Sequence, residues 1–104
     1  MTDSQGKKNP TAGLDPLIHT PARLNIITNL YVVESADFIF LKNLTGLTWG
    51  NLSAHVSKLE NAGYLEVEKS IVNKKTHSVA ALTREGREAF EKYRQKMFEV
   101  LDKE

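Results

Sequence analysis

Apolar residues recur with the period of an α-helix between residues 48 and 62. Leu52, Val56 and Leu59 stand at positions i, i+4 and i+7, so a helix gathers them into one stripe. The residues turned away from that stripe, at about 100° per residue, are Gly50, Ala54, Ser57 and Lys58, with Asn51 and Ser53 on the flanks. Such a small, polar face fits the DNA major groove, which admits a helix and presents hydrogen-bonding base edges. An ordinary solvated helix face has the same pattern, so this helix alone leaves both interpretations open.

The pattern after this helix changes to the alternation of β-strands. Gly63 ends the helix as a left-handed cap, and the strand that follows turns Leu65 and Val67 inward. A second strand-like run extends from residue 77 to residue 82. The segment between the strands is basic: it contains no acid from residue 69 to residue 77, and its lysines are Lys69, Lys74 and Lys75. The two strands therefore predict a β-hairpin with a basic tip.

Three shorter segments precede this unit. Residues 1–13 are polar and predict a mobile tail. Thr20 and Pro21 form a favoured helix start, and the helix continues through Leu24, Ile27, Leu30 and Tyr31 to a break near residues 34 and 35. Ser35 is predicted to cap a second short helix whose apolar face is Phe38, Leu41 and Leu44, and Gly46 makes the following turn. Thr48 caps the helix described above. The predicted order is α-α-α-β-β-α, with room for a small extra strand beside the hairpin and for a short N-terminal helix.

The last predicted helix, about residues 84–103 after a Thr83 cap, carries a heptad-like seam. Its core positions 86, 90, 93, 97 and 100 step by 4, 3, 4 and 3, a spacing suited to packing against another helix. We expect the N-terminal Leu14, Leu17 and Ile18 to supply part of the surface that this seam covers, and a second copy of the chain to supply the rest. The alternative is that the helix only folds back on its own domain. The predicted dimer interface consists of Leu14, Leu17, Ile18, Phe90, Tyr93, Met97, Val100 and Leu101.

The order of these motifs resembles the winged-helix transcriptional regulators of the MarR-like and ArsR-like group, especially their small single-domain type. The matching phrases, with x for positions that do not count, are DFxFLK at 37–42, LTGLT at 44–48, GNLSxH at 50–55, KLExAGY at 58–64 and LTxxGR at 82–87. The resemblance covers residues 21–90. It implies an α+β, mainly α fold: a winged helix-turn-helix with a β-hairpin wing and a long C-terminal dimerisation helix. One departure is that Thr76 and His77 stand where relatives often carry a Pro and an Arg in the wing.

Length and composition narrow the class. A chain of 104 residues makes one domain, here residues 14–104 after the tail. The net charge of +1 is small, so attraction to DNA must come from the local distribution of charge. There is no cysteine for a disulfide, or for a thiolate metal sensor of the kind found in some ArsR-like relatives. No apolar run approaches the ~20 residues of a membrane span and no secretory segment is seen, so we expect a cytoplasmic protein without a membrane partner.

An enzyme is not expected, because the sequence has no Gly-rich phosphate loop, no nucleophile motif and no cluster of metal ligands. The histidines His19, His55 and His77 share no spacing that indicates a zinc site. His55, at the edge of the helix stripe, is expected to be half-buried and bonded to a neighbour. Trp49 is expected to pack on the second helix or to rest against the sugar-phosphate backbone. We predict neither a metal nor a cofactor.

Two functions remain from the sequence. In the first, which the resemblance implies, a homodimeric regulator binds double-stranded DNA with residues 48–62 in the major groove and the wing, residues 69–77, on the backbone or minor groove. The predicted DNA-binding residues are Thr48, Gly50, Asn51, Ser53, Ala54, Ser57, Lys58, Lys69, Lys74, Lys75 and His77. In the second, the domain is a protein-interaction module, which has no need of the lysine cluster, whereas DNA affinity rests on such phosphate neutralisation. The resemblance also allows a small-molecule effector, but no polar constellation in the sequence marks its pocket.

Overall fold

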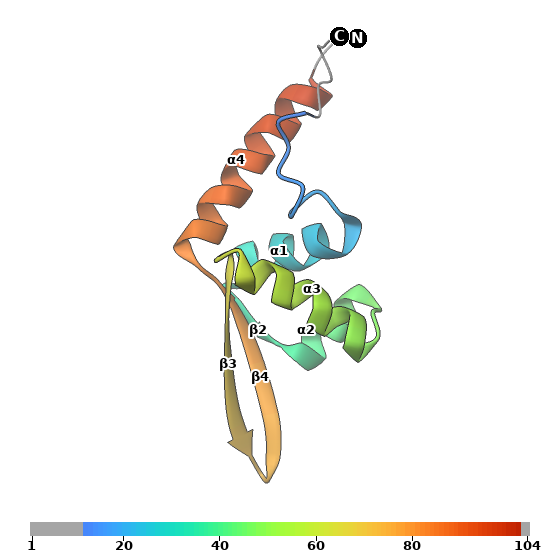
Figure 1. Cartoon of the computed structure of the whole chain (residues 1–104), viewed down its shortest axis with the longest axis vertical. Coiled ribbons are helices and arrows are strands. Elements are labelled where there is room, and N and C mark those ends of the chain that lie inside the picture. Colours follow the sequence, from blue (N-terminus) through green and yellow to red (C-terminus); the bar gives the residue numbers. More distant parts are fainter. Residues whose placement is uncertain (1–11, 103–104) are drawn as a thin grey trace.

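The computed structural model describes residues 12–102 (Figure 1). Its elements are α1 (Pro21–Val33), β2 (Ser35–Asp37), α2 (Phe38–Thr45), α3 (Trp49–Asn61), β3 (Leu65–Val72), β4 (Lys75–Leu82) and α4 (Arg84–Leu101). This order of helices followed by a long hairpin and a final helix is the predicted winged helix fold. Most of the tail predicted over residues 1–13, and the helix end predicted at residue 103, lie outside the described residues.

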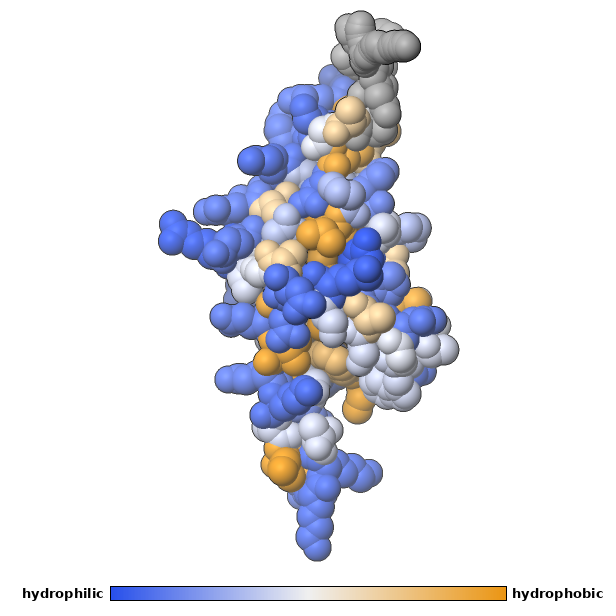
Figure 2. Space-filling model, viewed as in Figure 1, coloured by the Kyte–Doolittle hydropathy of each residue, from blue (hydrophilic) through white to orange (hydrophobic). Residues whose placement is uncertain are grey.

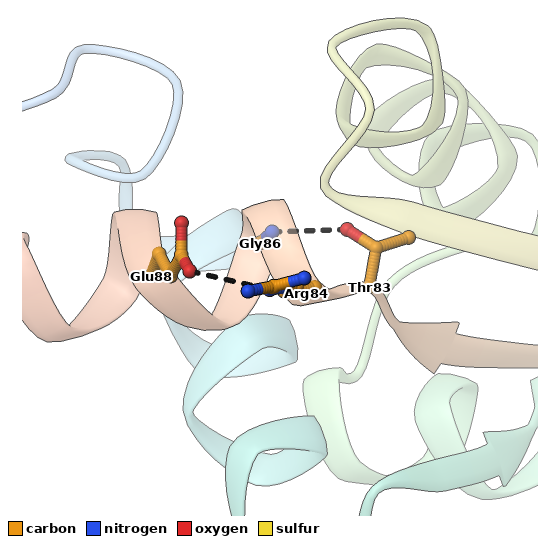
Figure 3. A network of polar contacts seen from close by, with 4 residues as sticks. All are labelled: Thr83, Arg84, Gly86 and Glu88. Atoms are coloured by element: carbon orange, nitrogen blue, oxygen red, sulfur yellow. Dashed lines mark hydrogen bonds and ion pairs between the residues drawn. The ribbon is translucent and has the colours of Figure 1, made fainter.

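Side-chain caps and left-handed glycines define several of the predicted helix ends. The predicted cap of α1 is wrong in one respect: the Thr20 side chain makes no cap hydrogen bond, although Pro21 begins the helix as expected. The Thr48 hydroxyl accepts the Asn51 N–H at 3.1 Å at the start of α3, and the Thr83 hydroxyl accepts the Gly86 N–H at 2.9 Å at the start of α4. Figure 3 shows the second cap, next to the exposed ion pair between Arg84 and Glu88 (3.5 Å). Such caps satisfy backbone donors that the helix leaves free. Left-handed glycines follow α2 (Gly46, φ 71°) and α3 (Gly63, φ 85°).

The start of α2 and the segment before α1 differ from the prediction. Ser35 is not a helix cap: it begins β2, and Asp37 caps α2 by accepting the Phe40 N–H at 2.8 Å. Residues 35–37 form a strand rather than the first turn of α2 because they pair with β4. This pairing supplies backbone hydrogen bonds that a longer helix would lose. The predicted short N-terminal helix is replaced by turns around Asp15, whose carbonyl accepts the N–H groups of residues 18 and 19.

The sheet is antiparallel with the strand order β2-β4-β3. The wing strands are longer than predicted: β3 and β4 pair from Leu65 opposite Leu82 to Val72 opposite Lys75. Only Asn73 and Lys74 remain as the turn, both with positive φ (51° and 65°). Two such residues make a type I′ turn, whose twist matches that of the strands. The segment predicted as a loop over residues 69–77 is therefore mainly paired strand.

The core forms around α1, which packs against α2, α3, α4 and β4. Its fully buried side chains include Ile26, Ile27 and Leu30 of α1, Leu41 of α2, Leu52 and Leu59 of α3, and Leu65 of β3. The predicted phase of α3 is confirmed, because Leu52, Val56 and Leu59 are buried. In α2 the predicted apolar face is only partly correct: Leu41 is buried, but Leu44 is 37% exposed.

Half of the predicted dimer interface is corrected by this core. Leu14, Ile18, Phe90 and Tyr93 are all buried within the single chain, where the N-terminal segment and α1 cover the first half of α4. The seam is real, but over this stretch its own domain covers it. Leu17, Met97 and Val100 are half-buried, whereas Phe98 and Leu101 are 71% and 75% exposed. The second half of α4 extends beyond the body of the domain (Figure 1).

Gly86 in the first turn of α4 lies directly against the backbone of residue 64. A Cβ at this position would stand 2.1 Å from the Tyr64 carbonyl oxygen and 2.9 Å from a methyl carbon of Leu82. Gly50 in α3, by contrast, has nothing within 4 Å of the same hypothetical atom. The two helical glycines therefore have opposite structural roles.

We predict that Gly86→Ala destabilises the domain by about 1–3 kcal/mol or more, as overpacking against a backbone atom does. Gly50→Ala should stabilise it by about 0.5–1 kcal/mol, because alanine has the higher helix propensity. Urea unfolding of both variants and the parent measures the difference. Equal midpoints for the two variants would show that α4 does not approach Tyr64 this closely.

Candidate nucleic-acid interface

The outer face of α3 is free of contacts with the rest of the domain. Thr48, Gly50 and Asn51 at its start are exposed, as are Ser53, Ala54, Ser57 and Lys58 along its length. These seven are the helix residues that the sequence predicted for DNA contact. Since the opposite stripe is anchored in the core, the helix presents this face as a surface of mostly small and polar side chains.

A buried arginine supports α3 from behind. Arg23 of α1 is 9% exposed, and it donates from Nε to the Leu17 carbonyl (2.6 Å) and from a terminal nitrogen to Nδ1 of His55 (3.1 Å). Arginine only donates, so Nδ1 must be an acceptor and the imidazole neutral. The pKa of His55 accordingly lies below its ordinary value of 6.5, mainly because of burial and further because of the Arg23 and Lys58 charges. His55 is half-buried and bonded to a neighbour, as predicted.

We predict that His55 makes the stability of the domain depend on pH. Because its folded pKa is depressed, the unfolded chain binds more protons just below pH 6.5. The free energy of unfolding that neutral His55 contributes is therefore fully present above the pKa of the unfolded chain. It is lost as the pH falls toward the lower pKa of the folded state. His55→Gln, which keeps an acceptor for Arg23, should remove this part of the dependence. Urea midpoints at about pH 7.5 and 5.5 for parent and variant measure it, and parallel losses in both proteins would contradict it.

Trp49 extends this surface toward α2. The side chain is 52% exposed, and Nζ of Lys42 lies 5.3 Å from the centre of its ring, a cation–π contact with α2. The Trp49 ring thus contacts α2, which is the first of the two arrangements expected from the sequence. Lys42 also adds a positive charge beside the start of α3, which the sequence reading did not assign.

The wing contributes the basic part of the surface. Lys69, Lys74 and Lys75 are exposed, whereas His77 is half-buried. Lys74 adopts φ 65°, a left-handed conformation that costs a residue other than glycine about 1–2 kcal/mol. Glycine is the usual residue at this place in a type I′ turn. The turn thus holds a lysine at a position that glycine would occupy with less strain.

A hollow of about 310 Å³ joins the wing to the start of α3. Its lining includes Trp49 of α3, Ile39 of α2, and Lys75 and His77 of β4. Residues separated by more than 25 positions in the sequence thus border one continuous surface. The two elements that were predicted separately for DNA contact are neighbours in the fold.

A second hollow, of about 390 Å³, lies between the N-terminal segment and α4, and Tyr64 after α3 also lines it. It contains a polar group that the sequence did not reveal: the Tyr64 hydroxyl donates to the Asp15 carboxylate, and Tyr93 lines the same space. Burial, and then the hydrogen bond and charge of Asp15, raise the pKa of Tyr64 to about 12.

The histidines do not come together. His19 lies beside Tyr93, with 2.8 Å between Nδ1 and the hydroxyl oxygen, His55 meets Arg23, and His77 is on the wing. Across residues 12–102, no three His, Cys, Asp or Glu side chains are grouped so that they could hold a metal ion. Within the same residues, no helix is both long and apolar enough to cross a membrane.

A helix with a free polar face followed by a basic hairpin defines the class of winged helix proteins. This chain belongs to the family described as the winged helix DNA-binding domain, whose model matches residues 22–101. The family and fold are those of DNA-binding proteins rather than enzymes.

Relatives and solved structures agree with this assignment. An uncharacterized protein of Methanocaldococcus jannaschii is 34% identical over 85 residues, which is 82% of this chain and 89% of that protein. A transcriptional regulator homologue from Pyrococcus horikoshii has a TM-score of 0.77 and 28% identity over 83% of this chain and 85% of its own. The structure of NadR in complex with 4-hydroxyphenylacetate has a TM-score of 0.68 and covers 97% of this chain and 82% of its own; at 21% identity it shows the likeness of fold alone.

Three residues of the surface and its support were missed in the sequence: Arg23, Asp37 and Lys42. The burial of Arg23 could have been predicted, because it stands at the i position of a helical stripe that continues at i+3, i+4 and i+7 with Ile26, Ile27 and Leu30. A guanidinium buried in such a stripe needs a hydrogen-bond partner. Asp37 is a favourable helix cap, but Ser35, only two residues earlier, is equally favourable and was predicted as the cap of α2. Lys42 has no local signal, since its contact depends on the angle between α2 and α3.

Proposed function

We propose that this protein is a homodimeric, sequence-specific regulator of transcription that binds double-stranded DNA. The α3 face, within residues 48–62, would enter the major groove, and the wing over residues 69–77 would lie on the backbone or in the minor groove. The observation that carries the proposal is the continuity of the two surfaces: Trp49 at the start of α3 borders the same hollow as Lys75 and His77 of the wing. Because a regulator of transcription must have access to the DNA, we propose that the protein is located in the cytoplasm.

The residues on this surface suit different parts of DNA. Asn51 and Ser53 flank the α3 face, and an asparagine amide can pair with adenine in the major groove. Lys58 has the reach to contact a base edge or a phosphate from the end of the helix. The wing lysines would contact phosphates, which adds affinity with little sequence preference. Gly50, Ala54 and Ser57 would mainly allow the close approach of the helix.

The interaction-module alternative gives no account of the wing tip. A protein-binding wing has no need of lysine in the turn, where glycine is less strained, or of a segment from residue 69 to residue 77 without an acid. DNA binding does, because affinity rises with each phosphate that is neutralised. The strained and uniformly basic tip therefore favours DNA.

We predict that Lys74→Gly combined with Lys75→Ala weakens DNA binding and flattens its salt dependence. Two lysines in each subunit make up to four phosphate contacts per dimer, so the log–log salt slope should fall by as much as ~3.6. Binding of labelled random duplex DNA across a salt series measures this.

The same variant separates affinity from stability. Lys74→Gly relieves the φ of 65° and should leave stability unchanged or raise it by up to about 1 kcal/mol. Weaker binding by a protein that is no less stable cannot result from unfolding. An unchanged slope would remove the wing from the interface, and a parent protein without salt-dependent DNA binding would support the interaction module.

The proposed dimer would use the end of α4. Phe98 and Leu101 are exposed on the part of the helix that leaves the domain, next to the half-buried Met97 and Val100 (Figure 1). Large apolar side chains grouped on one short stretch favour a partner surface. In a two-fold dimer the α3 helices would meet successive major grooves about 34 Å apart, favouring a pseudo-palindromic site with ~10 bp between half-site centres.

We predict that Phe98→Glu with Leu101→Glu dissociates the dimer, because charges in an apolar interface cost several kcal/mol. Sedimentation velocity of variant and parent gives the oligomeric state. Val32→Glu is the matched control, since Val32 is an apolar residue of α1 that is 76% exposed and lies outside the proposed interface. A dimer that survives the α4 change would place the interface elsewhere, and a monomeric parent would contradict the proposed assembly.

A further inference from the structure

The wing carries an exposed apolar side chain just behind its basic tip. Ile71 is 77% exposed, although isoleucine is among the residues most often buried in proteins. Its neighbour Val72 is 48% exposed and points to the other face of the hairpin. Figure 2 shows an apolar patch at this end of the molecule, next to the hydrophilic tip. Its cross-strand partner is Thr76, and the described part of the fold leaves the Ile71 side chain largely in solvent.

The register of the hairpin sets which way Ile71 points. Side chains at alternate positions of β3 share a face, so Ile71 lies on the face of Leu65, Val67 and Lys69. At the base of the wing that face is buried: Leu65 is 2% exposed, and β3 packs there against α3. Ile71 therefore stands on the side of the sheet that holds the DNA-reading helix.

The charge around Ile71 selects its partner. Lys69 is on the same face, Lys74 is in the turn, Lys75 begins the next strand, and no acid occurs from residue 69 to residue 77. The register places Lys75 on the opposite face, with Val72, so a protein surface that covered Ile71 would have to accept Lys69 and the turn residue Lys74 as well. The minor groove of DNA suits both features, because apolar sugar edges line its walls and phosphates border it.

The length of the wing is sufficient. Eight residues of β3 extend about 26 Å at ~3.3 Å each. One helical turn of DNA is about 34 Å, so the minor groove next to a given major groove lies roughly half that distance away. A wing that starts beside α3 can thus bring Ile71 into the neighbouring minor groove.

We propose that Ile71 is an apolar wedge that enters the minor groove at a base step and bends the duplex. Side chains of this kind partly unstack a step in several minor-groove binders. The step would be a flexible pyrimidine–purine step, TA or CA/TG, because these unstack at the lowest cost. This rests on the proposed function and adds to it a source of sequence preference that uses no hydrogen bond to a base.

The experiment compares Ile71→Ala with Val72→Ala, its neighbour on the opposite face, and with Ile71→Leu. The probe is a duplex enriched by the parent protein from a random pool, carrying 2-aminopurine at the candidate step and a fluorophore at each end. Ile71→Ala should bind about tenfold more weakly, the effect of withdrawing two or three methyl-sized groups from a partly buried contact. It should also lose the 2-aminopurine signal and the bend, while the salt slope stays unchanged because no phosphate contact is lost. Ile71→Leu and Val72→Ala should behave like the parent.

Several results would overturn the wedge. These are parental bending and 2-aminopurine signal in Ile71→Ala, an equal loss in Val72→Ala, or a lower salt slope without a change in bending. A loss of self-association instead of DNA bending would assign Ile71 to a protein contact. Each is distinct from failure of the proposed function, which would appear as a parent protein without salt-dependent DNA binding.

Discussion

The close approach of Gly86 to the backbone of Tyr64 fixes the geometry on which the rest of the domain depends. The Tyr64 N–H closes the end of α3 on the Leu59 carbonyl, and the Tyr64 carbonyl accepts the Thr83 N–H at the start of α4. The Tyr64 hydroxyl meets Asp15 of the N-terminal segment. Three parts of the chain thus converge on one residue, and the contact leaves no space for a Cβ on Gly86. Since α3 is proposed to read DNA and α4 to pair two subunits, this joint would set the distance between half-sites.

The wing contains two departures from local rules close together, and others lie at Glu34, which ends α1 with φ 75°, and at the exposed Val32 and Phe98. Lys74 occupies a left-handed position suited to glycine, and Ile71 is exposed although the core has other apolar residues of its size buried completely. In natural proteins such conflicts are concentrated at functional sites, where another gain offsets their cost. Helices α3 and α4 have side-chain caps and a buried stripe, whereas α1 has no side-chain cap hydrogen bond. Under the proposed function α3 and the hairpin would both supply contact, and the buried stripe of α3 would hold its outer face in place.

The sequence alone was sufficient to predict those parts of the fold that depend on neighbouring residues. The phase of α3 follows from Leu52, Val56 and Leu59, and its ends follow from Thr48 and Gly63; all are read from neighbouring positions. The seam of α4 was recognised for the same reason, but periodicity shows that a face is buried and not what buries it. Phe90 and Tyr93 are covered by their own chain, because a segment about 70 residues earlier folds over them. The contact of Lys42 with Trp49 could not be predicted from the sequence, because it depends on how α2 and α3 pack. The same holds for the hollow that Trp49 and Lys75 both line, which depends on how the wing is placed beside α3.

The small net charge of +1 makes the arrangement of charges more important than their sum. On β3 the exposed Glu66 and Glu68 point to the face opposite Leu65, Val67 and Lys69. Glu60 at the end of α3 lines the same hollow as Glu66 and Glu68, so the base of the wing is acidic. The register places Lys75 and His77 on the same face of the hairpin as these two glutamates, but nearer to the tip. Under the proposed function, phosphates would be repelled from the base of the wing and attracted to its tip. Like-charge contact of this kind suppresses wrong orientations more than it changes affinity. The change of sign along the hairpin would therefore orient the wing on DNA, which a uniformly basic protein could not do.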